Sequence, residues 1–134
     1  MENLHRIADE LGVSIRRGSL PHGWWGAYDH RVHGITVHDA ARGIQLRSIL
    51  AHELGHAYHR HAGSTPRFER EASHWAARHL ISMGAFLDCL HWCDRKQGAA
   101  HHLGVLPSDV QHYIDSLSPA EVELIRRYVR QESA

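Results

Sequence analysis

The chain has 134 residues, and its 15 lysines and arginines balance 15 aspartates and glutamates, so its formal net charge at pH 7 is zero. This length predicts one compact domain, and a hydrophobic content of 43% is enough for a real core. The charge balance offers no electrostatic footprint for phosphates, and no apolar run approaches the roughly 20 residues of a membrane span, so nucleic-acid binding and membrane insertion are both disfavoured.

The first forty residues predict a short helix and three strands. Residues 3–12 carry apolar side chains on one helical face and end at Gly12, a helix stop. Strand-like segments follow at residues 13–17, 23–28 and 31–38. The aromatic residues Trp24, Trp25 and Tyr28 can pack in the core or line a groove, and we expect at least one tryptophan in the core.

Residues 48–57 place His52, Glu53 and His56 in H-E-x-x-H register. On an α-helix, residues four apart lie nearly above one another, so both imidazoles can reach one metal ion. Glu53 lies about 100° from His52, where its carboxylate can hold a water at the metal and take its proton. A chain with 15 histidines would contain about 0.1 such motifs by chance, so the surrounding sequence decides.

The surrounding sequence predicts a long amphipathic helix. Apolar residues recur at helical spacing around the motif, which implies one buried face. No proline interrupts residues 40–63, and the stretch from Gly63 to Pro66 supplies a stop. The two histidines therefore lie on one side of a predicted helix.

Two histidines leave a catalytic zinc site one protein ligand short. Residues 68–80 have apolar side chains at i, i+4, i+7 and i+8, which predicts a second helix packed on the first. Glu71 shares a face with Trp75, and a carboxylate there needs a partner or a metal when it is buried. Glu69 is expected to point elsewhere, into solvent. His74, one turn from Glu71, is the rival ligand or an orienting group.

A third ligand histidine in the pattern H-E-x-x-H-x-x-G-x-x-H is excluded, because this chain has His59 and Ala62 where that pattern needs Gly and His. His59 and His61 are expected to lie at the exposed end of the motif helix. Cationic character there suits the C-terminal helix dipole.

Residues 85–94 predict a third helix, which carries Cys89 and Cys93. Two cysteines four apart can bind a metal, but we interpret them as small buried hydrophobic residues. No signal peptide is apparent, so we expect a reducing cytoplasm, which disfavours a disulfide.

Residues 99–114 have the layout of a helix-turn-helix, with Ser108 as the expected cap of the second helix. That helix carries Asp109 and Asp115, and residues 97–125 contain neither Arg nor Lys. We therefore expect a packing or partner-docking segment rather than a DNA-reading one. A capping box, Ser118-Pro-Ala-Glu121, begins a final helix that runs to about residue 130.

These residues resemble the ImmA/IrrE family of small zinc metallopeptidases. The family pattern L-A-H-E-L-G-H-A matches residues 50–57 without a mismatch. A second pattern, E-x-E-A-[DN]-x-F-A-A, matches from Glu69, with Ser73 in place of Asn/Asp and Trp75 in place of Phe. The terminal Met-Pro of the family appears only as Met83-Gly84.

The resemblance implies an α+β, zincin-like fold in which a small N-terminal antiparallel sheet packs on a mainly helical body. An edge strand of that sheet aligns the substrate beside the metal. The third metal ligand of the family maps to Glu71, so one Zn²⁺ per chain would be bound by His52, His56 and Glu71. Glu53 would be the general base. The role implied is cleavage of a protein partner, commonly a helix-turn-helix repressor of a phage or mobile element.

The sequence as a whole therefore predicts a cytoplasmic zinc metallopeptidase, with its catalytic core in residues 1–83 and a helical subdomain in residues 84–134, together one compact unit. Candidate oxyanion stabilisers are Tyr28, His33 and His38. Two alternatives stay open. The first is a regulatory binding protein that keeps the fold with little activity, and the second is a DNA-binding regulator that uses residues 99–114.

Overall fold

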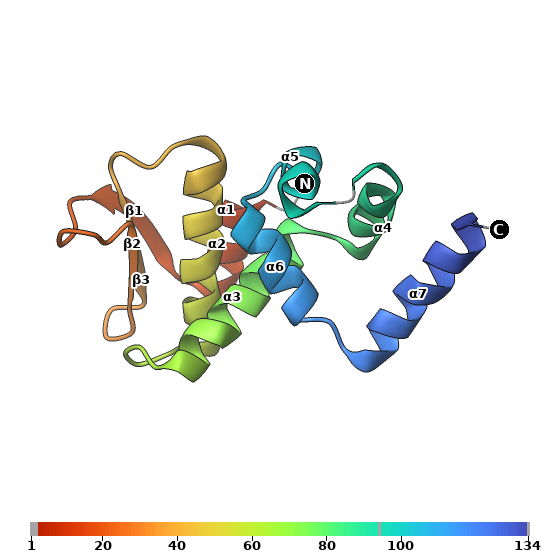
Figure 1. Ribbon diagram of the computed structural model, residues 1–134. Helices are drawn as coiled ribbons and strands as arrows, with labels where there is room; N and C mark the ends of the chain where they lie inside the picture. Colours follow the sequence, from red (N-terminus) through yellow and green to blue (C-terminus); the bar gives the residue numbers. More distant parts are fainter. Residues whose placement is uncertain (1–2, 94, 134) are drawn as a thin grey trace.

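The computed structural model describes residues 3–93 and 95–133. Within this part the chain forms a small sheet and a larger helical body, which confirms the α+β fold class expected from the sequence (Figure 1). The elements in chain order are α1 (Leu4–Leu11), β1 (Ser14–Gly18), β2 (Gly26–Asp29), β3 (Gly34–His38), α2 (Gly43–His59), α3 (Pro66–Leu80), α4 (Met83–Trp92), α5 (Lys96–Leu103), α6 (Pro107–Asp115) and α7 (Pro119–Ser133).

The sheet is mixed rather than antiparallel. Its strand order is β1-β3-β2, and β3 runs parallel to β1 and antiparallel to β2. After β1 the chain crosses through residues 19–25 to the far edge, and a hairpin at residues 30–33 then returns β3 to the middle. The expected antiparallel sheet is therefore wrong for the β1–β3 pair, because alternation within a strand carries no information on the direction of its neighbour.

Helix α2 is central to the fold and contacts both the sheet and α3 (Figure 1). Ile35 and Val37, on the inner face of β3, are almost completely buried in the same core as the apolar side chains of α2. The buried residues of α2 all fall between positions 50 and 57. The segment that carries the H-E-x-x-H motif is therefore the most enclosed part of the helix.

Helices α2 and α3 pack backbone to backbone where Gly55 meets Ala72. A Cβ atom built on Gly55 would lie 2.6 Å from the carbonyl oxygen of Ala72 and 2.8 Å from its Cα, closer than real Cβ atoms come. Ala72, Ala76 and Ala77 of α3 are themselves fully buried. Small residues on both helices permit this approach, and it brings the side chains on either side of Gly55 within reach of α3.

Substitution Gly55→Ala should destabilise the protein by roughly 2 kcal/mol or more, because the clash with the Ala72 backbone outweighs the gain of about 1 kcal/mol in helix propensity. Chemical denaturation followed by circular dichroism measures the change. Gly84→Ala is the matched control, since nothing lies within 4 Å of a Cβ at this position of α4. Equal stability of the two variants would contradict the close contact.

The helices after α3 enclose a second core, in which the rings of Phe86 and Tyr113 lie 4.9 Å apart. Helix α6 packs on α3 across residue 83, the expected domain boundary, while the division itself stays a prediction. Asp109 is buried and accepts hydrogen bonds from the Leu106 N–H at 3.0 Å and from the Ser48 hydroxyl of α2 at 2.9 Å. Ser108 is thus not the cap of α6, and Asp109 anchors the helix instead of facing solvent.

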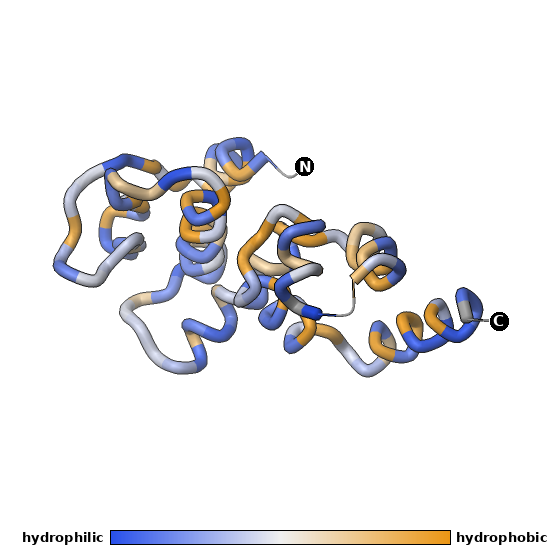
Figure 2. Tube along the Cα trace, turned by 45° about the horizontal axis from the view of Figure 1, so that its top comes forward, coloured by the Kyte–Doolittle hydropathy of each residue, from blue (hydrophilic) through white to orange (hydrophobic). Residues whose placement is uncertain are grey.

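Helix α7 projects from the body at the right of Figure 1, and Figure 2 shows hydrophobic and hydrophilic residues interspersed along it. The predicted capping box is confirmed: Ser118 N–H donates to the Glu121 carboxylate at 2.9 Å, and Glu121 N–H donates to the Ser118 hydroxyl at 3.1 Å. Arg78 of α3 binds both carboxylate oxygens of Glu121. The hydrogen bonds from Arg78 lower the pKa of Glu121 to about 2.

Glu121→Gln should loosen α7, because glutamine keeps the capping box but loses its charge opposite Arg78. We expect hydrogen exchange of α7 amides at pH 7 to become about twofold to fivefold faster. The pKa of Glu121 is lowered on folding, so its stabilising contribution is present above about 4.5 and lost as the pH falls toward about 2. The difference between variant and wild type should vanish over that range. Glu123→Gln, whose ion pairs stay within α7, serves as the control.

The remaining elements agree with the sequence apart from their ends. The helix expected at residues 85–94 is observed as α4, which begins at Met83, and Asp94 lies outside the described residues. Cys89 is buried and Cys93 partly buried, and both thiols are free. In the part of the chain that the structure describes, no helix is both long and apolar enough to cross a membrane.

Candidate metal centre

Two histidines of α2 and one glutamate of α3 converge on a single point. His52 Nε2 lies 3.1 Å from one carboxylate oxygen of Glu69, and His56 Nε2 lies 3.1 Å from the other. One ligand atom from each of the three residues falls within 4.8 Å of the other two. The H-E-x-x-H spacing thus brings its two imidazoles together as the sequence predicts.

The third member of this cluster is Glu69 and not Glu71. The expectation that Glu69 points into solvent is wrong, since its carboxylate bridges both imidazoles. Glu71 instead accepts a hydrogen bond from His61 at 2.9 Å, and that bond holds the pKa of Glu71 below its usual range. The structure therefore does not bring the resemblance-based ligand set of His52, His56 and Glu71 together.

Helical geometry explains the exchange of the two glutamates. Glu69 and Glu71 lie about 160° apart around α3, so only one of them can face α2. The buried stripe of α3 consists of alanines, and Ala72 and Ala76 lie on the side of Glu69. The apolar pattern that includes Trp75 predicted that the Glu71 side of α3 would be buried. Trp75 is only half buried, and its ring stacks on His79 at 3.8 Å. The sequence feature that could have identified Glu69 is Ser73, because it occupies the family's Asn/Asp position and shares a helical face with Glu69.

Burial and neighbouring groups shift the pKa values of His56 and Glu69. Burial lowers the pKa of His56, which favours the neutral imidazole that a metal requires. Burial opposes the charge on Glu69, yet the hydrogen bond from the Ser64 hydroxyl and the two neighbouring imidazoles hold its pKa below the usual value. A neutral His56 imidazole and an ionised Glu69 carboxylate are therefore both favoured at this point.

Glu53 is buried next to the cluster, with 9% of its surface exposed. Burial, and after it the negative charge of Glu69, raises the pKa of Glu53 to about 8. Strand β2 passes directly over it at Gly26, where a Cβ would lie 3.0 Å from Glu53 Cγ and 2.7 Å from Ile49 Cγ2. A glycine at this position lets the strand approach the carboxyl group.

Each imidazole also has a partner on its outer nitrogen. His52 Nδ1 lies 3.2 Å from the Ser73 hydroxyl, so serine takes the supporting place expected for Asn or Asp. His56 Nδ1 lies 2.9 Å from His61 Nδ1. His61 was expected at the exposed end of α2 but is buried, because the chain reverses at Arg60 in a left-handed conformation with φ 52°.

A cleft of about 320 Å³ opens beside the cluster. It is lined by β2, by Glu53, His56 and Glu69, and by Gly63 and Ser64 of the α2–α3 loop. Because β2 is an edge strand, one side of its backbone is free of sheet pairing and lies along this cleft. Trp24 stands at the same cleft with 55% of its surface exposed, and Trp25 is 41% exposed, so the expectation of a tryptophan core residue in this segment is wrong.

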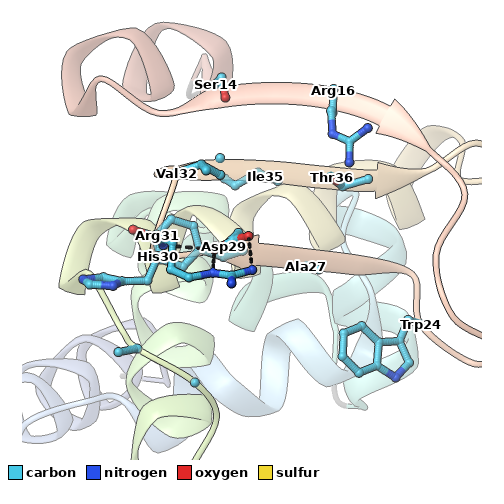
Figure 3. A pocket seen from close by; sticks show the side chains of 14 residues that line it. Ser14, Arg16, Trp24, Ala27, Asp29, His30, Arg31, Val32, Ile35 and Thr36 are labelled. Atoms are coloured by element: carbon cyan, nitrogen blue, oxygen red, sulfur yellow. Dashed lines mark hydrogen bonds and ion pairs between the residues drawn. The ribbon is translucent and has the colours of Figure 1, made fainter.

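A larger hollow of about 520 Å³ continues over the outer face of the sheet (Figure 3). Arg16 of β1 and the ion pair between Asp29 and Arg31 lie along it, and Trp24 stands at one end. Trp24, Ala27 and Tyr28 border both hollows. The two hollows therefore adjoin at the β2 edge of the sheet.

The three candidate oxyanion stabilisers occupy different places. His33 Nε2 donates to the Leu11 carbonyl at 3.0 Å, so its Nδ1 accepts the Tyr28 hydroxyl proton at 2.6 Å. Tyr28 borders the cleft with its hydroxyl engaged in this way. His38 lines a separate hollow with Trp25. His74, the rival ligand, lies on α3 near His112 of α6 and outside the cluster.

The donor set fits a divalent metal ion. Two imidazole nitrogens and a carboxylate oxygen are the usual protein ligands of catalytic zinc, and their outer nitrogens are hydrogen-bonded as metal-bound histidines require. Their spacing is set by α2 and α3, which the core holds together. With Glu53 adjacent, the arrangement can bind a metal and move a proton beside it.

Glu69→Gln should weaken zinc binding on the order of a thousandfold, because it removes the charged ligand of a three-residue set. Competition against a chromophoric chelator measures the affinity. Glu71→Gln should have a much smaller effect, and Glu123→Gln on α7 should have none. If Glu71→Gln abolishes binding while Glu69→Gln retains it, the third ligand is Glu71 after all.

The sequence matches a family model described as the IrrE N-terminal-like domain, of the M78 peptidases, over residues 6–114. The match covers most of the chain and continues beyond α4 to the end of α6. No curated protein matches the chain.

Proposed function

This chain belongs to the IrrE-like family of M78 peptidases, and from that premise we propose that it is a zinc-dependent metalloendopeptidase. The observation that carries the proposal is the convergence of His52, His56 and Glu69 beside a buried Glu53. Zinc in catalytic sites takes three such ligands and keeps a further position open for water or substrate. The cleft along β2 gives a peptide access to that position.

Different residues of the chain have different roles in peptide hydrolysis. His52, His56 and Glu69 would hold a divalent cation, which would supply Lewis acidity toward water and a peptide carbonyl. Glu53 accepts the proton of the attacking water as the new C–O bond forms, and it delivers that proton to the leaving nitrogen as the C–N bond breaks. Burial raises the pKa of Glu53 to about 8. The positive charge of a bound cation beside it would lower this pKa toward neutral pH, where a carboxylate can accept a proton.

The free edge of β2 supports an extended peptide as substrate. A peptide added to this edge gains main-chain hydrogen bonds, while its side chains reach the hollows on either side. Trp24 offers an exposed aromatic face to one of those side chains. We further propose that the natural substrate is one protein partner in the cytoplasm, a helix-turn-helix repressor of a phage or mobile element, as the resemblance implies.

Two other functions compete with this one. A regulatory binding protein with a purely structural metal has no need of Glu53, and burying an unneeded carboxyl group beside the ligands costs stability. A DNA-binding regulator would use residues 99–114, but the buried Asp109 and the packing of α6 on α3 support a structural role for that segment. A salt-dependent mobility shift on duplex DNA separates the last alternative.

Glu53→Gln should lower kcat/KM by roughly 10²–10⁴-fold, because it removes the proton acceptor and leaves the three metal ligands in place. Cleavage of a mixture of quenched fluorescent peptides, and of candidate repressors, measures the activity, and metal analysis checks that zinc content is unchanged. Removing zinc with a chelator should abolish cleavage, and adding it back should restore it.

Equal cleavage by wild type and Glu53→Gln would contradict the assigned role of Glu53. A zinc-loaded wild type that leaves every peptide and every candidate repressor intact would favour the regulatory alternative.

A further inference from the structure

Behind His56, two further side chains continue a line of hydrogen bonds away from the metal centre. His56 Nδ1 lies 2.9 Å from His61 Nδ1, and His61 Nε2 lies 2.9 Å from a carboxylate oxygen of Glu71. Neither His61 nor Glu71 borders the cleft. Both are therefore placed to act on the metal centre only through His56.

The position of every proton in this line follows from the ligand geometry. His56 directs Nε2 at the metal point, so with a metal bound there Nε2 offers its lone pair and Nδ1 carries the hydrogen. His61 Nδ1 then has to be the acceptor, and the hydrogen of its neutral ring lies on Nε2. That hydrogen meets the Glu71 carboxylate. With a metal on His56 Nε2 and both rings neutral, the hydrogen bonds run, donor to acceptor, from His56 through His61 to Glu71.

His61 is held in this orientation on both faces of its ring. Its side chain is 4% exposed, and its ring stacks on Phe68 at 4.2 Å and on His59 at 4.9 Å. The left-handed backbone at Arg60, which costs a non-glycine residue free energy, turns the chain back so that the His61 N–H bonds to the His56 carbonyl at 3.0 Å. The backbone and both ring faces of His61 are therefore fixed, whereas the side chain of a surface histidine is free to rotate.

The two ligand histidines are supported unequally. The outer nitrogen of His52 meets the neutral hydroxyl of Ser73 at 3.2 Å. The outer nitrogen of His56 meets a ring that is itself polarised by a carboxylate. Hydrogen bonds to charged groups are about twice as strong as neutral ones, so support of this kind makes His56 the better electron donor.

We propose that His61 and Glu71 are positioning residues, which fix the tautomer and orientation of His56 and raise its affinity for the metal. This relay rests on the proposed metallopeptidase function and places Glu71 two residues beyond the metal, behind His56 and His61. The stronger hydrogen-bond support of the ligand histidines therefore comes from His61 in the α2–α3 loop, and the weaker support comes from Ser73.

Zinc affinity, measured by chelator competition, tests the relay. His61→Phe keeps a flat ring between Phe68 and His59 but offers no acceptor, and it should weaken binding by about 10–100-fold. His61→Asn restores an acceptor oxygen near the Nδ1 position and should recover part of that loss. Arg67→Ala is the matched control, since it removes the exposed ion-pair partner of Glu71 at 3.5 Å without touching His61, and it should change nothing.

A double-mutant cycle separates the relay from simple packing. Glu71→Gln alone should weaken zinc binding by less than about tenfold, and it should add no further loss in the His61→Phe background, because Glu71 acts through His61. Unfolding of the metal-free variants shows how much of each effect is mere stability. Additive losses in the cycle would overturn the relay.

Long-range ¹H–¹⁵N spectra of the zinc-loaded wild type give a second, independent result. They should show hydrogen on Nδ1 of His56 and on Nε2 of His61, and hydrogen on His61 Nδ1 would overturn the proposal even if His61→Phe did not fold. Equal zinc affinity of wild type and His61→Phe overturns the relay alone. A wild type that binds no zinc overturns the metallopeptidase proposal as well.

Discussion

The backbone contact between Gly55 and Ala72 is the constraint on which the rest of the molecule depends. The histidines of α2 lie on either side of that glycine, and a carboxylate of α3 reaches them only because the helices touch without side chains between them. Any larger residue would widen the gap by more than the slack in a metal–ligand bond permits. Glycine inside the H-E-x-x-H motif is therefore a requirement of packing as much as the histidines are a requirement of chemistry.

The same contact explains how charge is tolerated in a small core. Glu53 and His56 are buried next to apolar residues of α2, where unpaired polar groups are costly. In the described part of the chain, no buried side-chain nitrogen or oxygen lacks a hydrogen-bond partner. The partners of His56 are Glu69 of α3 and His61 of the loop before it, so this cluster and the helix packing stabilise each other. A residue that disturbs one is expected to disturb the other.

Sequence reasoning located the motif helix, its two histidines and the helix that carries Glu69, because these depend on local periodicity. It chose Glu71 over Glu69 from the resemblance and from the largest apolar side chains, whereas the tightest interface uses the smallest ones, such as Ala72. It could not see His61 turn inward, since that depends on a single left-handed residue at Arg60. The direction of β1 relative to β3 was equally hidden, because it is decided by a crossing loop.

The loop from Arg60 to Thr65 differs from most surface connections in what it can tolerate. Loops usually accept insertions and deletions, because their residues serve only to join two elements. Here His61 reaches back to α2 and Ser64 reaches forward to Glu69, so the loop is tied down near both ends. Its length is consequently fixed by the site, and an affinity tag or a linker belongs after α7 rather than between these two helices.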